Sequence, residues 1–444
     1  MIGPSHDETH GTVYTLTDHE LLDRHRAVMP DWMPLNYRHP IELVHGSGRR
    51  VTDSYGRTYL DFFGGMMATM LGHNVPEIVA AVKSQSDKIL HTSTLYLIRA
   101  QIELAEKIAA KAPVDDPRVF FVNSGSEAVD TALMLASHFR SSNQILAMRG
   151  SYHGRSLAAA AVTGLRSWSP SGLTPFNVAF APNGYKYRSP YRDRSDRAFI
   201  DACRDDLRTV IETSSAGAIA CYIAEPIQGA GGITTPPDGY FAAVQSVLDD
   251  YGIPFVSDET QTAWGRTGYS YFGIEHHGIR PKAMTFAKGL ANGLSIGGVV
   301  AEASMMNTLT THSISTAGGN PVAMAAANAV LDFVESHSLQ QRAEEVGTRL
   351  GEGLHQLADQ FLMIGEVRGS GLMWGLEIVH PHTLDPDPIR AADLIEHARE
   401  AGLLIGGGGL HRNILRLTPP MTITSPEITE ALSYLRYALT QIRP

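Results

Sequence analysis

Cysteine is scarce in this chain, because only Cys203 and Cys221 occur among its 444 residues. Two cysteines are too few for a disulfide framework, and no residues with metal-ligand spacing surround them, so we predict no metal site. Cys221 lies within the apolar run 219–223 and is most simply a small residue of the core.

Long apolar runs and an excess of positive charge are also missing. No apolar stretch approaches the roughly 18 to 20 residues that are needed to span a bilayer. The opening MIGPSHDETH lacks the basic region and following apolar region of a secretory signal. The net charge of −10 gives no reason to expect nucleic acid or an anionic membrane as a partner. We therefore expect a cytoplasmic protein that binds neither nucleic acid nor membrane.

Lysine is rare, with seven examples among the 36 Lys and Arg residues. Most of them lie in polar, helical or loop-like surroundings. Lys288 differs, because it ends the apolar run 283–287, where strand alternation places it on the face of Met284 and Phe286. A lysine in this position is either an edge residue that reaches solvent or a functional amine.

Strand-like and helix-like segments alternate from about residue 118 to residue 305. Apolar strands separated by helices predict an α/β fold with a mainly parallel central sheet flanked by helices. Ligands bind at the carboxyl ends of the strands in such sheets, where the motifs NSG, DET and AKG fall. The segments that contain the expected strands are 118–125, 144–150, 219–227, 254–260, 283–288 and 295–302.

The length of the chain favours two or three lobes. We expect an N-terminal segment, residues 1–60, that packs with the small domain. A large domain follows over residues 61–325, and a small α+β domain follows over residues 326–444. A basic loop at 183–197 is interpreted as a surface excursion.

The motif NSGSEAVD has two interpretations. Ser124 and Glu127 have the spacing of a helix capping box, which is the commoner arrangement. Ser124, Gly125 and Ser126 also fit a phosphate cradle, because the free N–H groups at a helix start bind anions. The motif by itself favours the cap.

Other polar residues at strand ends are equally ambiguous when each is considered alone. Asp258 in VSDETQT needs a cationic or N–H partner to stay ionised, and a structural ion pair with an arginine is the simpler explanation. Tyr152 in GSYHG is either a stacking ring or an ordinary loop aromatic. Arg416 in RLTPP is either a carboxylate binder or half of a buried pair, for instance with Glu225. The motif STAGGNP fits either an anion contact or a tight turn.

These signals agree on one cofactor. A desolvated lysine forms Schiff bases, a helix start holds phosphate, an aspartate pairs with a pyridinium nitrogen, and a flat ring stacks on the pyridine. Together they describe pyridoxal 5'-phosphate (PLP).

The chain resembles the class III (omega) aminotransferases of the fold-type I PLP family over nearly its whole length. Within that family it is most similar to the alanine–glyoxylate and beta-amino-acid–pyruvate enzymes, which HTSTLY and LLIGGGG also support. The motifs that carry the resemblance agree in order and spacing: YLDFFGGMMATMLGHN, FFVNSGSEAVDTAL, GSYHG, AEPIQGAGG, SDETQTAWGRTG, FAKGLANGLSIGG, STAGGNP, VRGSGLMWGLE and LRLTPPMTIT.

The resemblance implies a role for each residue that matches a family motif. Lys288 would form the Schiff base with PLP and shuttle the proton, and Asp258 would pair with the pyridine nitrogen. The other implied PLP contacts are Ser124, Gly125 and Ser126 at the phosphate, Thr316 at the phosphate from a neighbouring subunit, Tyr152 on the ring face and Gln261 at the phenolic oxygen. The implied substrate contacts are Arg416 for a carboxylate, Glu225 to neutralise Arg416 when the substrate has no carboxylate, and Met67 in the pocket wall.

The sequence departs from the family pattern in places. Thr260 stands where valine is usual, TAWG replaces TGFG, and Leu294-Ser295 replaces a proline-containing turn. None of these changes touches Lys288 or Asp258, so they affect the expected substrate and not the expected chemistry.

The implied reaction is a ping-pong exchange. An amine or amino acid of the omega- or beta-amino type loads the cofactor, and an oxo acid such as pyruvate, glyoxylate or 2-oxoglutarate unloads it. The implied assembly is a homodimer with shared active sites, or a higher oligomer. A decarboxylase, aminomutase or racemase on the same fold is the alternative, as is a non-catalytic PLP-fold binding protein. The patterns of P-loop, Rossmann and α/β-hydrolase proteins are absent.

Overall fold

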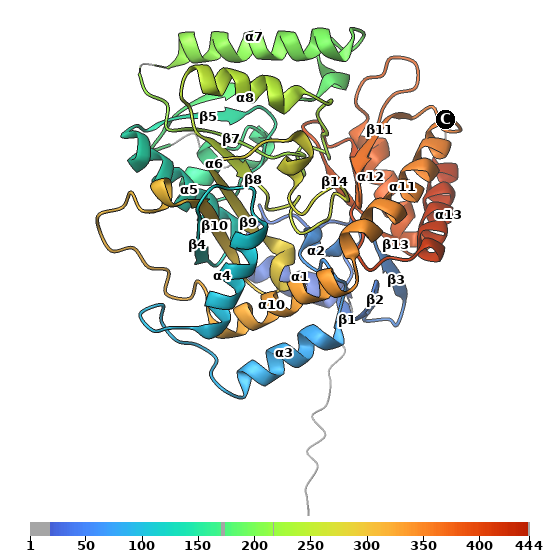
Figure 1. Cartoon of the computed structure of the whole chain (residues 1–444). Coiled ribbons are helices and arrows are strands. Elements are labelled where there is room, and N and C mark those ends of the chain that lie inside the picture. The colour runs from blue at the N-terminus through green and yellow to red at the C-terminus, as the bar shows by residue number, and fades with distance from the viewer. Residues whose placement is uncertain (1–17, 170–173, 216, 443–444) are drawn as a thin grey trace, which may run out of the picture.

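The computed structural model describes residues 18–169, 174–215 and 217–442. Its centre is a seven-stranded sheet in the order β4-β10-β9-β8-β7-β5-β6 (Figure 1). The strands are β4 (Pro117–Val122), β5 (Gln144–Met148), β6 (Asn177–Ala181), β7 (Cys221–Ala224), β8 (Phe255–Asp258), β9 (Ala283–Ala287) and β10 (Gly297–Glu302).

The sheet is parallel except at one strand. β10 pairs antiparallel with β4 and β9, and the other neighbours pair parallel. β7, β8 and β9 are buried along their whole length, because helices cover both faces and no residue of these strands faces water. The prediction of a mainly parallel α/β sheet is confirmed.

Helices cover the two faces of this sheet. α5 packs on β9 and β10, α7 packs on α8 and β6, and α10 packs on α3 and α4. Their bounds are α2 (Gly64–Met67), α3 (Pro76–Ser86), α4 (Arg99–Lys111), α5 (Gly125–Arg140), α6 (Leu157–Ala161), α7 (Asp196–Ser214), α8 (Tyr240–Asp250), α9 (Ala303–Met306) and α10 (Pro321–Ser336). Short 3-10 turns lie at η1 (Arg166–Trp168), η2 (Lys186–Arg188), η3 (Gly273–His277) and η4 (Lys288–Ala291).

The C-terminal part of the chain forms an antiparallel sheet in the order β11-β12-β15-β14, with three helices grouped at one side of the molecule (Figure 1). Its elements are α11 (Leu339–Ala358), β11 (Ile364–Ser370), β12 (Met373–Ile378), α12 (Pro388–Ala401), β14 (Gly406–Gly408), β15 (Ile414–Leu417) and α13 (Ser425–Gln441).

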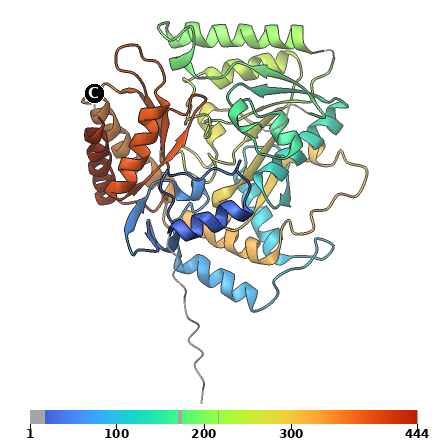
Figure 2. The same cartoon turned by 180° about the vertical axis from the view of Figure 1, so that it is seen from behind.

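The two ends of the chain meet in a third sheet, β1-β2-β3-β13. Leu60 of the N-terminal part pairs in parallel with Leu403 of the C-terminal part. Its strands are β1 (Leu43–Ser47), β2 (Arg50–Asp53), β3 (Thr58–Asp61) and β13 (Leu403–Leu404). Figure 2, the view from behind, shows helix α1 (Asp18–Val28) on the face that is turned away in Figure 1. The domain boundaries near residues 60 and 325 stay predictions.

The loop at 183–197 differs from its interpretation as a surface excursion. Its second half is exposed, but Tyr185 and Arg188 in its first half are only half-exposed and bond to the carboxylate of Glu377 on β12. The polar residues of this half are therefore turned inward by a buried acceptor that is distant in sequence. Among the described residues no helix is both long enough and apolar enough to cross a membrane.

Candidate active site

Lys288 lies immediately after β9 and begins the turn η4. Its φ of +46° is left-handed, so the strand alternation that predicted its direction stops at Ala287. A left-handed residue other than glycine costs about 1–2 kcal/mol, and strain of this kind is concentrated at functional sites. The sequence identified the correct strand end, but strand alternation does not apply to Lys288 itself.

The surroundings of Lys288 favour a neutral amine. Burial lowers the pKa of its ammonium group, and the positive charge of Arg416 lowers it further. The carboxylates of Glu225 and Asp258 oppose the shift, and the resulting pKa is about 7. A substantial share of the amine is therefore deprotonated at neutral pH, which is the form that attacks a carbonyl carbon.

Asp258 ends β8 and is only 3% exposed. Burial raises the pKa of its carboxyl group, but hydrogen bonds from His153, Thr260 and Thr285 lower the pKa below its usual value. His153 Nδ1 lies 2.7 Å from Oδ2, and Thr285 Oγ1 donates to Oδ1 over 2.8 Å. The partner of this aspartate is thus a histidine and not the arginine of the simpler interpretation, and the carboxylate is held as an anion.

Glu225 and Arg416 are linked through Gln261. Nε2 of Gln261 donates to Glu225 Oε2 over 3.3 Å, and Nη2 of Arg416 donates to Gln261 Oε1 over 3.2 Å. Burial raises the pKa of Glu225 to about 7, although bonds from the backbone N–H groups of Tyr152 and Gly229 oppose this. Within the described part of the chain, Arg416 and Glu225 do not form the direct ion pair that the sequence left open, because Gln261 lies between them.

The N-terminus of α5 lies against the ends of β8 and β9. A Cβ atom on Gly125 would meet Thr260 Cγ2 at 3.3 Å and Ala287 Cβ at 3.5 Å, so a larger residue would fill this approach. Ser124 caps the helix, because its Oγ accepts a hydrogen bond from the N–H of Glu127. The first N–H groups of a helix have no acceptor within it, so the cap leaves donors for an anion.

The remaining predicted residues lie at the edge of this cluster or outside it. The ring of Tyr152 packs edge-on against Trp168, with centroids 5.9 Å apart. Ser126 Oγ accepts a hydrogen bond from the N–H of Arg155. Met67 is buried in a small apolar cluster with Ile227, Ile233 and Met373. Thr316 is exposed on the loop before α10 and joins none of these contacts.

His153 is the functional candidate that sequence reasoning did not single out. It lies beside Tyr152 in GSYHG, and its side chain is fully buried against Asp258. The only available signal in the sequence was its position next to the candidate Tyr152, just after the expected strand at 144–150. Its partner is 105 positions away in sequence, and the spacing of residues does not show such a contact.

The residues at this sheet edge fit PLP. Among the buried polar atoms of the described residues that have no hydrogen-bond partner, three lie at this edge: His153 Nε2, Thr260 Oγ1 and Arg416 Nε. Buried polar atoms are nearly always paired in folded proteins, so orphaned atoms at a strand edge indicate a ligand or water. An amine, an anionic carboxylate and a helix start are the groups that hold the aldehyde carbon, the pyridine nitrogen and the phosphate of PLP.

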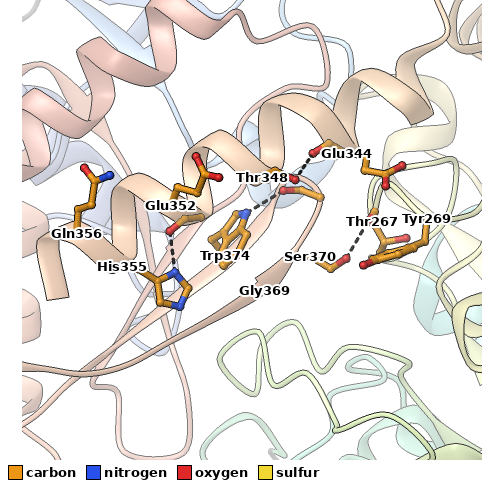
Figure 3. A pocket seen from close by; sticks show the side chains of 12 residues that line it. Thr267, Tyr269, Glu344, Thr348, Glu352, His355, Gln356, Gly369, Ser370 and Trp374 are labelled. Carbon is orange, nitrogen blue, oxygen red and sulfur yellow. Dashed lines mark hydrogen bonds between the residues drawn. The ribbon is translucent and has the colours of Figure 1, made fainter. Parts of the chain in front are cut away.

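A separate cavity lies elsewhere in the molecule. It has a volume of about 520 Å³ and opens between α11, the β11–β12 hairpin and the loop that carries Thr267 and Tyr269 (Figure 3). None of the candidate site residues lines it. This cavity is therefore separate from the polar groups at the strand ends.

Comparisons with known proteins agree with this geometry. The family model "Aminotransferase class-III" matches residues 33–439. The mitochondrial alanine–glyoxylate aminotransferase 2 homolog 2 of Arabidopsis thaliana is 35% identical over 93% of this chain and 86% of its own length. The leucine/methionine racemase of Thermococcus litoralis is 33% identical over 95% of this chain and 96% of its own length.

A solved structure supports the same assignment. The amine transaminase from an uncultivated Pseudomonas species, in its PLP-bound form, is 31% identical, with a TM-score of 0.84 over 90% of this chain and 95% of that chain. Fold, strand-end chemistry and family model all lead to one conclusion. The chain belongs to the class III aminotransferase family, whose members depend on PLP.

Proposed function

We propose that Lys288 is the reacting amine of this class III aminotransferase and holds PLP covalently. The enzyme moves an amino group from an amino donor to an oxo acid in two half-reactions. When it is bound, PLP supplies the electron sink and carries the amino group between the two. The observation that supports the role of Lys288 is its buried amine with a pKa near 7 beside Asp258, Glu225 and Arg416.

The residues around Lys288 have separate tasks in this proposal. Asp258, held anionic by His153, would keep a proton on the pyridine nitrogen. The N-terminus of α5 would bind the phosphate through Ser124, Gly125 and Ser126. Further proposed contacts to PLP are made by Tyr152 at the ring, Gln261 at the phenolic oxygen and Thr316 of a second subunit. Once its amine is free, Lys288 would take a proton from the substrate carbon that bears the amino group. It would then deliver this proton to the other end of the 1,3-transfer.

Arg416 and Glu225 together would allow two kinds of amino donor. A substrate carboxylate would bind Arg416, whose Nε has no partner. A simple amine brings no such charge, and Glu225 would then balance Arg416 through Gln261. We therefore propose an amine or an omega- or beta-amino acid as the donor, and pyruvate, glyoxylate or 2-oxoglutarate as the acceptor, with Met67 in the pocket wall.

Substitution of Arg416 by alanine tests this division. We expect kcat/KM for L-alanine to fall by roughly 100-fold, because a charge-assisted hydrogen bond contributes about 1.5–3 kcal/mol. The value for 1-phenylethylamine should change by less than about fivefold. Steady-state rates with glyoxylate as the acceptor measure both values. Equal losses for the two donors would refute this role for Arg416.

The rate at which the apo-protein takes up PLP should depend on pH through Lys288. The neutral amine reacts, so the rate should rise as the pH rises through about 7. Arg416→Ala removes a charge that lowers the pKa, so the midpoint should move to higher pH. Glu225→Gln removes a charge that raises the pKa, so the midpoint should move to lower pH. A midpoint that neither variant moves would contradict this account of the electrostatics.

Racemization is the second candidate, because relatives of this chain include a racemase. The two reactions differ in what they consume. A racemase inverts one amino acid enantiomer without an acceptor, whereas an aminotransferase bleaches its PLP once and stops. Chiral chromatography after incubation with one donor alone separates the two functions.

We also propose a homodimer with shared active sites, or a higher oligomer built on it. The exposed position of Thr316 supports this, because an exposed side chain is accessible to a second subunit. Light scattering of the purified protein, with wild type and Thr316→Ala compared for PLP affinity, tests the proposal. The cytoplasmic location expected from the sequence stays a prediction that cell fractionation tests.

A further inference from the structure

A buried carboxylate on β12 collects donors from both parts of the molecule. Glu377 is 1% exposed, and the loop after β6 supplies Tyr185 and Arg188 as donors to it. From the C-terminal part, Arg368 Nη1 donates to Glu377 over 3.0 Å and Asn413 Nδ2 donates over 2.9 Å. None of these residues belongs to the site described above.

Arg368 differs from the other donors because its second target lies in the turn 229–233. Its Nε and Nη2 donate to the carbonyl of Gly232 over 3.1 Å and 2.8 Å. Nη1 also donates to Glu366 over 2.5 Å, so the guanidinium is held on all sides. The planar fork of arginine makes this arrangement possible, and a lysine ammonium does not reproduce it.

The turn that Arg368 holds is strained and contacts the active site. Ile233 has a φ of +55°, an outlier for a β-branched residue, and it is fully buried in the apolar cluster with Met67. At the other end of the turn, the N–H of Gly229 donates to Glu225 Oε2 over 2.9 Å. Strain of this kind persists only where surrounding contacts enforce it.

We propose that Arg368 is a positioning residue that fixes the turn 229–233 and, through it, Glu225, and so sets the preference between neutral amines and carboxylate-bearing donors. This inference rests on the proposed roles of Glu225 and Arg416. If the turn relaxes, Glu225 loses a donor and balances Arg416 less well. A neutral amine needs that balance, whereas a donor with a carboxylate supplies its own negative charge.

Arg368→Lys and Arg188→Lys form a matched pair for the test. Both substitutions remove guanidinium bonds to Glu377 and keep the positive charge, but only Arg368 touches Gly232. We expect Arg368→Lys to lower kcat/KM for 1-phenylethylamine about tenfold more than for L-alanine. Arg188→Lys should leave the ratio within about twofold of wild type. The PLP affinity of both apo-proteins, from fluorescence quenching, should stay unchanged.

Gly375→Ala provides a second route to the same turn. A Cβ atom there would lie 2.8 Å from the carbonyl oxygen of Gly232, so the substitution displaces the turn while Arg368 remains. We expect the same shift in donor preference, and this variant decides the matter if Arg368→Lys does not fold. An unchanged donor ratio in the folded variants, or the same shift in Arg188→Lys, would overturn the inference. The proposed function would survive that outcome, provided that Arg416→Ala still lowers kcat/KM for L-alanine more than for 1-phenylethylamine.

Discussion

Replacement of Lys288 by alanine is expected to lower transamination by several orders of magnitude and to give purified protein without the yellow colour of bound PLP. The variant has no amine at the end of β9, so it would lack both the proposed covalent anchor and the group proposed to move the proton. Steady-state turnover and the visible spectrum measure the two effects. The melting temperature should show that the variant is folded.

Lys282→Ala is the matched control. Lys282 precedes β9, at the end of the strand opposite to Lys288. It forms an ion pair with Glu302 of the neighbouring strand β10. Its loss removes a partly exposed ion pair, which contributes about 1 kcal/mol or less to stability. We expect turnover within about twofold of wild type. Full activity in Lys288→Ala would rule out Lys288 as the reacting amine.

Replacement of Asp258 by asparagine is expected to lower kcat by roughly 100- to 1,000-fold, because it removes a fixed charge from the reacting centre. Asparagine keeps the shape of the side chain but, in the proposed role of this residue, would no longer hold a proton on the pyridine nitrogen. Because the loss concerns a charge in the reaction and not donor binding, KM should change far less than kcat. Steady-state kinetics at saturating donor and acceptor separate the two.

Glu259→Gln is the control for this substitution. Glu259 is adjacent to Asp258 in sequence and fully buried, but its carboxylate accepts the N–H groups of Gly273 and Ile274 on the other side of the strand end. Its replacement should lower the melting temperature. The kcat of the folded enzyme should fall far less than it does in Asp258→Asn. A kcat for Asp258→Asn that equals wild type would contradict the role of Asp258.

The positions of the main candidates could be predicted from the sequence because they follow apolar strands. Asp258 ends β8 and Lys288 directly follows β9. These strands are adjacent and parallel, so the proximity of the two residues follows from the fold class. The left-handed φ of Lys288 could not be predicted, because it arises in the turn that returns the chain to β10. Local alternation carries no information about such a turn.

Contacts between distant segments account for the rest. The bond from His153 to Asp258 and the bridge of Gln261 between Glu225 and Arg416 depend on tertiary packing. The inward turn of Tyr185 and Arg188 depends on Glu377, a residue about 190 positions later. The polar and basic composition of the loop 183–197 does not reveal that acceptor, so composition alone predicted an exposed loop.

Reduction of the PLP-loaded enzyme with borohydride, followed by peptide mass mapping, tests the central claim most directly. The chain has only seven lysines, so the modified residue can be assigned without ambiguity. The account predicts one reduced cofactor per chain, on the peptide that contains Lys288. A label on any other lysine, or no label on protein that is yellow and active, would contradict it.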